Sequence, residues 1–355
     1  MIDFINKYRK ERKAITLRKT LSIITLVFLV SFTLSCSATE AQVRASAQKI
    51  IFDCDMGADC DDAGALALAY ELEREGKIEI LGIIASSKDK YSIGAIDAIS
   101  TYYGKGTDSL YGVNNTIDIG CGDGLRYDGG NGYSDDLAND TSRYNHNIVT
   151  KTSLTSMRDK YYSILNSQPD GSVIVVVVGH TGGLYSILED SNDRDLFHQK
   201  VKKVCFMTYT GTTWLTDYNF SDKNAHPYTQ FVLDNLNVDC YFGCHGSHAV
   251  YTGSTLRSKY TIDNPVKRSF DIILGGTSER PSWDQLVVMY AAFGDNEWFS
   301  EESFGKLEYN TSQTRWNTTV NRSNHYRSLL EIPANTMEDI IEDYMIKVPL
   351  AGYVR

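Results

Sequence analysis

Five of the chain's aspartates stand in the ten-residue string DCDMGADCDD, which covers residues 53–62. A short apolar run typical of a strand precedes the string, and a pattern typical of a helix follows it. So many like charges at one turn are costly unless a cation lies among them. Carboxylates without a nearby Cys/His pair suit a hard ion such as Ca²⁺ or Mg²⁺. The string therefore predicts a metal site, and the alternative is a solvated acidic turn with a helix cap.

Two common carboxylate motifs do not fit this string. An EF-hand loop that began at Asp53 would need Gly at its sixth position and Glu at its twelfth, where this chain has Ala58 and Gly64. A haloacid-dehalogenase phosphatase would carry Thr or Val two residues after Asp55, where Gly57 stands. A third metal motif fits better.

With Ala63-Gly64-Ala65-Leu66 after it, the string resembles the opening motif of the inosine–uridine-preferring nucleoside hydrolase family, in its longer variant. The resemblance continues in chain order over nearly all of the rest of the sequence. Its further motifs are residues 82–84 (GII), 179–184 (GHTGGL), Met207, 217–220 (DYNF) and 282–285 (SWDQ). The first and last motifs are specific, and the others gain force from their order.

The resemblance implies a Ca²⁺-dependent hydrolase that cleaves the N-glycosidic bond of ribonucleosides to base and ribose. Asp55, Asp62 and Asp284 would be metal ligands, together with a backbone carbonyl near Gly182. Asp55 would also be the general base for the attacking water. The substrate would be bound by Asp61 at the 2′- and 3′-hydroxyls, by Asp217 and Asn219 at other sugar hydroxyls, and by Met207 and Trp283.

The chemistry implied by these roles is coherent. A metal lowers the pKa of water and clamps vicinal hydroxyls, while a carboxylate beside it removes the proton. The sugar passes through an oxocarbenium-like state, and anionic groups stabilise its positive charge. A strongly negative site suits this reaction better than phosphate transfer, whose substrate is itself anionic.

Three departures from the family pattern keep the substrate open. Many members carry, at the position of Trp283, a His that protonates the leaving base. A Trp at this position resembles the purine-preferring branch, and stacking of a base on the indole adds about 1–3 kcal/mol of binding. A core aromatic is the alternative for this residue. Asp217 is one methylene shorter than the family's Glu, and residues 85–88 (ASSK) lack the family's Asn. Two further hypotheses are therefore a related enzyme acting on another ribosyl or sugar compound, and a non-catalytic nucleoside- or sugar-binding surface lipoprotein.

Alternating strands and helices must position these residues. The pattern predicts a single α/β domain with a mostly parallel, Rossmann-like central sheet flanked by helices, whose ligand site lies beyond the carboxyl ends of the strands. The β-branched run 173–178 is typical of a strand buried on both faces. We expect strands at 50–53, 78–84, 173–178, 204–207 and 238–242, helices at 62–75, 92–103, 153–165, 183–188, 228–236 and 284–293, a long loop at 114–139, a hairpin within 307–320, and a last helix capped by Asn335 or Thr336 that ends at Met345.

The N-terminus predicts export. Residues 1–35 contain a basic segment followed by the apolar run 21–34, which is short for a membrane span. Thr33-Leu34-Ser35-Cys36 resembles a lipobox, so we expect a lipoprotein-type signal peptide at 1–35, a tether at 36–48 and a nucleoside hydrolase-like domain at 49–355. The protein would be periplasmic or membrane-anchored at Cys36. Ordinary signal cleavage slightly later and an uncleaved anchor are the alternatives.

The net charge restricts the partners. The chain has a formal charge of −10, and residues 1–35 carry seven basic and two acidic side chains, so the remainder has −15. Such an acidic domain is unsuited to a nucleic acid polymer and fits a small nucleoside or sugar and a cation. We expect membrane contact only through a lipid anchor, and the quaternary state stays open, a homo-oligomer included.

Other candidate residues have structural alternatives. His180 could contact a substrate, although a buried structural histidine is the favoured interpretation. The spacing of Cys240, Cys244, His245 and His248 matches no common zinc module, and we expect Cys205 and Cys240 to be simply buried. The aromatic residues near Asp217 could line a pocket or belong to the core; they are Tyr209, Trp214, Tyr218 and Tyr228.

Overall fold

The computed structural model describes residues 47–57, 59–106, 110–113, 132–150, 154–221, 225–246, 249–275 and 279–347. The chain separates into two units, of residues 1–47 and 48–355, and every helix and strand below belongs to the second. The predicted signal peptide, Cys36 and nearly all of the tether lie outside the described residues. Within the described part, no helix combines the length and apolar character needed to cross a membrane.

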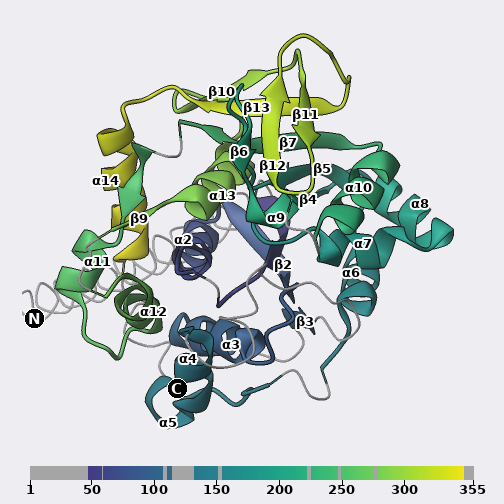
Figure 1. Ribbon diagram of the computed structural model, residues 1–355. Coiled ribbons are helices and arrows are strands. Elements are labelled where there is room, and N and C mark those ends of the chain that lie inside the picture. Colours follow the sequence, from purple (N-terminus) through teal and green to yellow (C-terminus); the bar gives the residue numbers. More distant parts are fainter. Residues whose placement is uncertain are drawn as a thin grey trace, which may run out of the picture. The chain divides into compact units, whose positions relative to one another are not determined.

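An eight-stranded sheet forms the centre of this second unit (Figure 1). All neighbouring strands are parallel except the edge strand β10, which pairs antiparallel with β13. The predicted α/β domain with a mostly parallel sheet is therefore confirmed. In spatial order the strands are β10 (Phe299–Glu302), β13 (His325–Leu330), β7 (Asp239–His245), β5 (Val201–Phe206), β4 (Val173–Val177), β1 (Gln48–Cys54), β2 (Ile78–Ala85) and β3 (Tyr111–Val113).

Helices cover both faces of this sheet. Successive side chains of a strand point to opposite faces, so a strand that is apolar throughout needs a cover on each side. Ile174 and Val176 of β4 pack into one core and Val175 and Val177 into the other, all of them buried. The strand at the predicted β-branched run is thus confirmed as buried on both sides. The first core is closed by α2 (Asp61–Arg74), α3 (Ser92–Tyr102), α12 (Pro265–Leu274), α13 (Trp283–Phe293) and α14 (Ala334–Met345), and the second by α6 (Met157–Asn166), α7 (Gly182–Leu188), α8 (Ser191–Lys200) and α10 (His226–Asn235).

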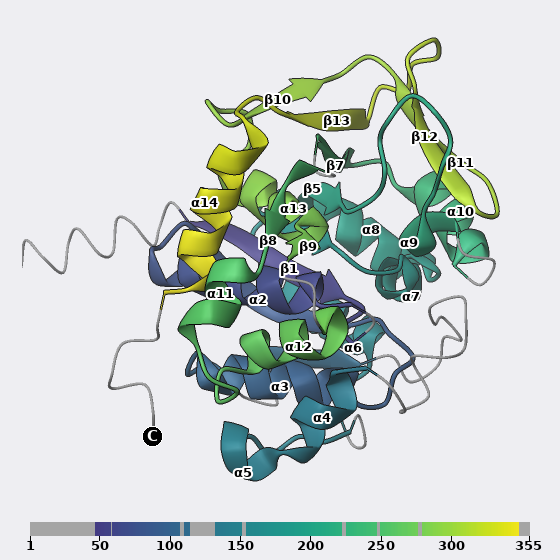
Figure 2. The same ribbon diagram turned by 60° about the vertical axis from the view of Figure 1, so that its left-hand side comes forward.

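Smaller elements lie beside the main sheet and its helices (Figure 2). The predicted hairpin is confirmed as β11 (Lys306–Tyr309) and β12 (Gln313–Asn317), with β6 (Leu215–Thr216) as a third strand. A separate pair of two-residue strands, β8 (Tyr251–Thr252) and β9 (Arg280–Pro281), precedes α13. The remaining short helices are α4 (Ser134–Asn139), α5 (Thr141–Tyr144), α9 (Tyr218–Ser221) and α11 (Ser254–Lys259).

Some boundaries differ from the prediction. The long loop expected at 114–139 is wrong in its last part, because residues 134–139 form α4; residues 114–131 lie outside the described part. The last helix has Pro333 as its N-cap, so Asn335 and Thr336 lie inside its first turn and do not cap it. The helix expected from residue 153 begins at Met157, because the Ser156 side chain caps it by accepting from the Asp159 amide.

Candidate active site

The aspartate string leaves the sheet at the carboxyl end of β1. Asp53 is fully buried there, and its Oδ2 accepts a hydrogen bond of 2.7 Å from the Tyr161 hydroxyl. Burial raises the pKa of Asp53 to about 7, although the hydrogen bond from Tyr161 acts in the opposite direction. The turn that follows depends on Gly57, which has φ +126° and where a Cβ would lie 3.0 Å from the Asp89 carboxylate. The apolar strand and this glycine hold the acidic turn at the end of the sheet.

Asp62 and Asp284, from opposite ends of the domain, meet at this turn. Each lies in the first turn of its helix, α2 or α13, and the two helices pack against each other in Figures 1 and 2. Both carboxylates are buried. The pKa of Asp284 is raised well above its usual value, first by burial and then by the charges of Asp62, Asp59 and Asp55. The charges of these aspartates therefore act on Asp284, and the packing of α2 against α13 brings the two motifs to neighbouring helices; their joint role as metal ligands stays a prediction.

The free oxygens of the cluster suit a hard cation. Among the described residues, Asp53 Oδ1, Asp61 Oδ2, Asp62 Oδ1 and Asp284 Oδ1 are buried without a hydrogen-bond partner, and buried polar atoms in that state call for an explanation. Carboxylate oxygens are the donors that Ca²⁺ prefers. Within the described part, however, no three Asp, Glu, His or Cys side chains already stand as a group that could hold a metal ion. The donor chemistry therefore fits such an ion, while the spacing is not that of a preformed site.

The turn after β4 lies directly against the acidic turn. A Cβ at Gly179 would be 2.5 Å from the Asp55 amide nitrogen, so only glycine permits this approach. A Cβ at Gly183 would overlap the carboxylate of Asp53. Gly182, the first residue of α7, stands between these contacts. The backbone predicted as a metal ligand is thus brought to the same end of the sheet as the carboxylates.

His180 in this turn is completely buried, and its Nε2 lies 3.2 Å from Asp55 Oδ2. Burial raises the pKa of Asp55, and the neighbouring imidazole acts against that increase. The partner of this histidine is therefore a carboxylate of the acidic cluster. The burial of His180 agrees with the expectation of a structural histidine. Its contact with Asp55, however, makes it part of the candidate active site.

The predicted sugar-binding residues lie at the carboxyl ends of β4 and β5. The Asn219 amide donates to the Val178 carbonyl at 2.8 Å, and the Met207 amide donates to the Val177 carbonyl at 2.8 Å. Asp217 is buried, and its carboxylate accepts from the Thr208 hydroxyl at 2.6 Å and from the backbone amides of Tyr209 and Phe220 at 2.9 and 2.8 Å. Both of its oxygens are thus engaged within its own loop, and its role toward a sugar stays a prediction.

Arg280 is a site residue that the sequence interpretation missed. Its Nη2 lies 2.5 Å from Asp59 Oδ2, and its Nε lies 3.8 Å from Asp61 Oδ1. Its guanidinium also stands over the indole of Trp283, 4.7 Å from the ring centre. Trp283 is half-buried, so it belongs neither to the deep core nor to the open surface. No sequence pattern marks Arg280, which lies in the two-residue strand β9 that pairs with β8.

The other candidates are less informative. Trp214 and Tyr218 are 37% and 58% exposed and therefore do not belong to the core. Cys205 and Cys240 are confirmed as buried, with free thiols. The side chains of Cys244 and His245, and all of His248, lie outside the described residues, so the absence of a zinc site stays a prediction.

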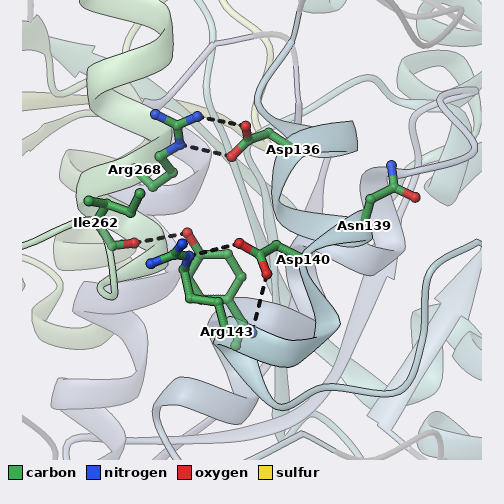
Figure 3. Close-up of a pocket in the computed structure, with 7 residues that line it drawn as sticks. Asp136, Asn139, Asp140, Arg143, Ile262 and Arg268 are labelled. Atoms are coloured by element: carbon green, nitrogen blue, oxygen red, sulfur yellow. Dashed lines mark hydrogen bonds and ion pairs between the residues drawn. The ribbon is translucent and has the colours of Figure 1, made fainter.

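A separate cleft of about 410 Å³ lies between α4, α5 and the start of α12 (Figure 3). Two arginines line it, and each is already held by aspartates. Arg268 makes two bonds to Asp136, of 2.8 and 2.7 Å, and Arg143 pairs with Asp140 at 2.7 Å. These charges compensate one another across the cleft, so we assign no chemistry to it.

Comparison with known proteins supports the fold. No protein-family model matches the sequence, and no curated protein matches it. The inosine-uridine preferring nucleoside hydrolase from Bacillus anthracis is similar with a TM-score of 0.62 at 15% identity, over 85% of this chain and 100% of that chain. The purine-preferring ribonucleoside hydrolase from Gardnerella vaginalis gives 0.55 at 11% identity, over 84% and 98%. The type III effector protein XopQ, solved with adenosine diphosphate ribose, gives 0.57 at 9% identity, over 87% and 96%.

The chain therefore has the nucleoside hydrolase fold, a single α/β domain with helices on both faces of a mostly parallel sheet. At these identities the likeness concerns the fold, and function must be argued from the residues of the site.

Proposed function

We propose that this protein is a Ca²⁺-dependent hydrolase that cleaves the N-glycosidic bond of ribonucleosides, with purine nucleosides preferred. The observation that carries the proposal is the set of buried carboxylates Asp55, Asp62 and Asp284, whose pKa values are all raised, first by burial and then by neighbouring aspartates such as Asp59. A cation is the simplest compensation for such a cluster. The names of the B. anthracis and G. vaginalis neighbours support the same substrate class.

Each residue has a defined task in this proposal. Asp55, Asp62, Asp284 and the carbonyl near Gly182 would hold the cation, which supplies a lowered water pKa and a clamp on vicinal hydroxyls. Asp55 would take the proton of the attacking water. Asp61, whose Oδ2 has no hydrogen-bond partner among the described residues, would accept from the ribose hydroxyls.

The leaving base would be bound at Trp283. The indole is half-buried and stands one residue before Asp284, so a base stacked on it would lie close to the acidic cluster. The cluster's negative charge would stabilise the oxocarbenium-like sugar. A phosphorylated substrate would be repelled by the same charge, and this favours a neutral nucleoside.

The direct test is nucleoside turnover by the full chain, with and without EDTA, followed by chromatography of the released base. We expect Ca²⁺-dependent release of base and ribose, and loss of turnover in Asp55→Ala. Asp343→Asn, which changes an exposed aspartate on α14, is the matched control and should keep normal turnover. Normal rates in Asp55→Ala would refute the role of Asp55.

The two alternatives give different results in the same assay. Sugar release only from non-nucleoside compounds would indicate an enzyme for another ribosyl substrate; the XopQ structure was solved with such a compound, although its phosphates would be repelled by the acidic cluster of this chain. Metal-dependent binding without turnover would indicate a non-catalytic surface protein. Both outcomes would overturn the proposed reaction while leaving the fold unchanged.

We also propose export and lipid attachment at Cys36, supported by the basic and apolar composition of residues 1–35. In a bacterial host the full chain should fractionate with membranes, and Cys36→Ala should release it or leave an unprocessed precursor. Equal fractionation of both proteins, with the same mass, would contradict lipid attachment.

A further inference from the structure

His180 is a buried imidazole whose charged neighbour is the proposed catalytic base. It follows β4 in the turn that Gly179 allows to lie against the backbone of Asp55. Its side chain has no solvent exposure, and its Nε2 stands 3.2 Å from Asp55 Oδ2. The contact joins two turns that leave neighbouring parallel strands at the same end of the sheet.

Packing alone does not explain an imidazole at this position. Among the described residues, neither ring nitrogen of His180 makes a hydrogen bond of normal geometry. A buried polar group without partners costs about 1–3 kcal/mol, and an apolar side chain would fill the space without that cost. The nitrogens of His180 must therefore have a use that outweighs the cost.

Two other buried histidines show what a structural imidazole does in this fold. His325 Nδ1 accepts from the Leu307 amide at 3.2 Å, and His146 Nε2 meets the Ala138 carbonyl at 3.1 Å. Each of them holds a backbone group of a neighbouring segment. His180 instead faces the Asp55 carboxylate. It is therefore placed to orient that carboxylate and not a backbone group.

We propose that His180 is a positioning residue for Asp55: its Nε2, which faces Oδ2 at 3.2 Å, would donate to that oxygen when the cation is bound, so that the other carboxylate oxygen stays available to the cation and the attacking water. This inference rests on the proposed function and adds a residue to its machinery. A carboxylate can rotate about its last bond, and a single fixed donor on one oxygen restricts that rotation. Groups that orient metal ligands in this way typically change metal affinity or activity 10- to 100-fold when they are removed.

The test compares three variants of the full chain by calorimetric titration with CaCl₂. His180→Leu fills the space without a donor, His180→Asn has an amide that is too short to reach Asp55, and His180→Gln places an amide N–H near the former Nε2. We expect the Leu and Asn variants to bind Ca²⁺ about 10- to 100-fold more weakly, and the Gln variant to bind close to the parent protein. His198→Leu removes a partly buried imidazole on α8 and should change nothing.

Each outcome discriminates between the possibilities. If His180→Leu does not fold, the Asn and Gln variants still compare a short donor with a donor of the right length. Equal losses in Asn and Gln, or unchanged affinity in all folded variants, would overturn the positioning role. A parent protein that binds no Ca²⁺ would refute the proposed function itself, and with it this inference. Turnover should follow the same rank order, chiefly in kcat, because the substrate contacts are unchanged.

Discussion

Without divalent cations, the free energy of unfolding of this protein should decrease as the pH rises from about 4 to about 7. The reason is the buried acidic cluster. Asp53 has a pKa of about 7 in the folded protein, against an ordinary value of 3.8, because burial disfavours its charged form. A carboxyl group whose pKa is higher in the folded state stabilises that state while it is protonated. This contribution is complete below pH 3.8 and is lost as the pH rises through about 7.

The expected magnitude is large for a single group. The difference between the folded and ordinary pKa values of Asp53 corresponds to about 4 kcal/mol in the free energy of unfolding. Asp62 and Asp284 have pKa values that are raised in the same direction. A cation that binds only the folded state at a hundred times its dissociation constant adds about 2.7 kcal/mol. For a domain of this size, that addition raises Tm by roughly 4 °C.

The assay is thermal unfolding followed by circular dichroism, with EDTA or CaCl₂, in buffers between about pH 4 and pH 8. In EDTA, Tm should fall as the pH rises, and Ca²⁺ should restore it most strongly at the higher pH. Asp53→Asn should flatten the decline, because its amide oxygen can still accept from Tyr161. Asp170→Asn changes an exposed aspartate paired with Lys200 and should leave the decline in place. A metal-free Tm that increases over this range would refute the reasoning.

Three further variants test the surrounding residues. Trp283→Ala should raise KM for purine nucleosides by the loss of about 1–3 kcal/mol of stacking, and Trp283→Phe should lose less; equal KM values in steady-state kinetics would exclude stacking. Arg280→Gln removes a positive charge beside Asp59 and Asp61, so its Ca²⁺ affinity by calorimetry should increase, and a decrease would be contrary evidence. Asp217→Ala leaves buried donors without their acceptor and should lower the free energy of unfolding in urea by about 1–3 kcal/mol; unchanged stability would show that this carboxylate does not hold its loop.

The elements that carry the cluster could be predicted because each has a regular pattern. The apolar strand before Asp53, the helix after Asp62 and the helix that begins beside Asp284 are all present. Two helices that were not predicted, α8 and α12, nevertheless carry cap signals. Asp190 accepts from two amides of the first turn of α8, and Asn264 does the same for α12. Both caps are of residue types that favour helix N-termini, so the sequence does contain a signal for these two helices.

The contacts that define the site are less predictable, because they depend on elements with little sequence pattern. Arg280 reaches Asp59 through a pair of two-residue strands, which are too short to show alternation. Asp217 was expected to face a sugar, yet its oxygens accept from the backbone amides of its own loop. Whether a carboxylate is turned inward or toward a ligand depends on side-chain geometry, which spacing along the chain does not determine.

The same burial that makes the cluster costly makes it suited to the proposed reaction. Acidic side chains held at the end of a sheet, with little solvent to screen them, bind a divalent cation more strongly than exposed ones do. They also stabilise a sugar that gains positive charge in the transition state. Because a bound cation would compensate only part of the negative charge, the remainder would act on the substrate. In the proposed reaction, the free energy that folding costs in bringing Asp62 and Asp284 together would be recovered as metal affinity and transition-state stabilisation, which would account for acids that are buried instead of solvated.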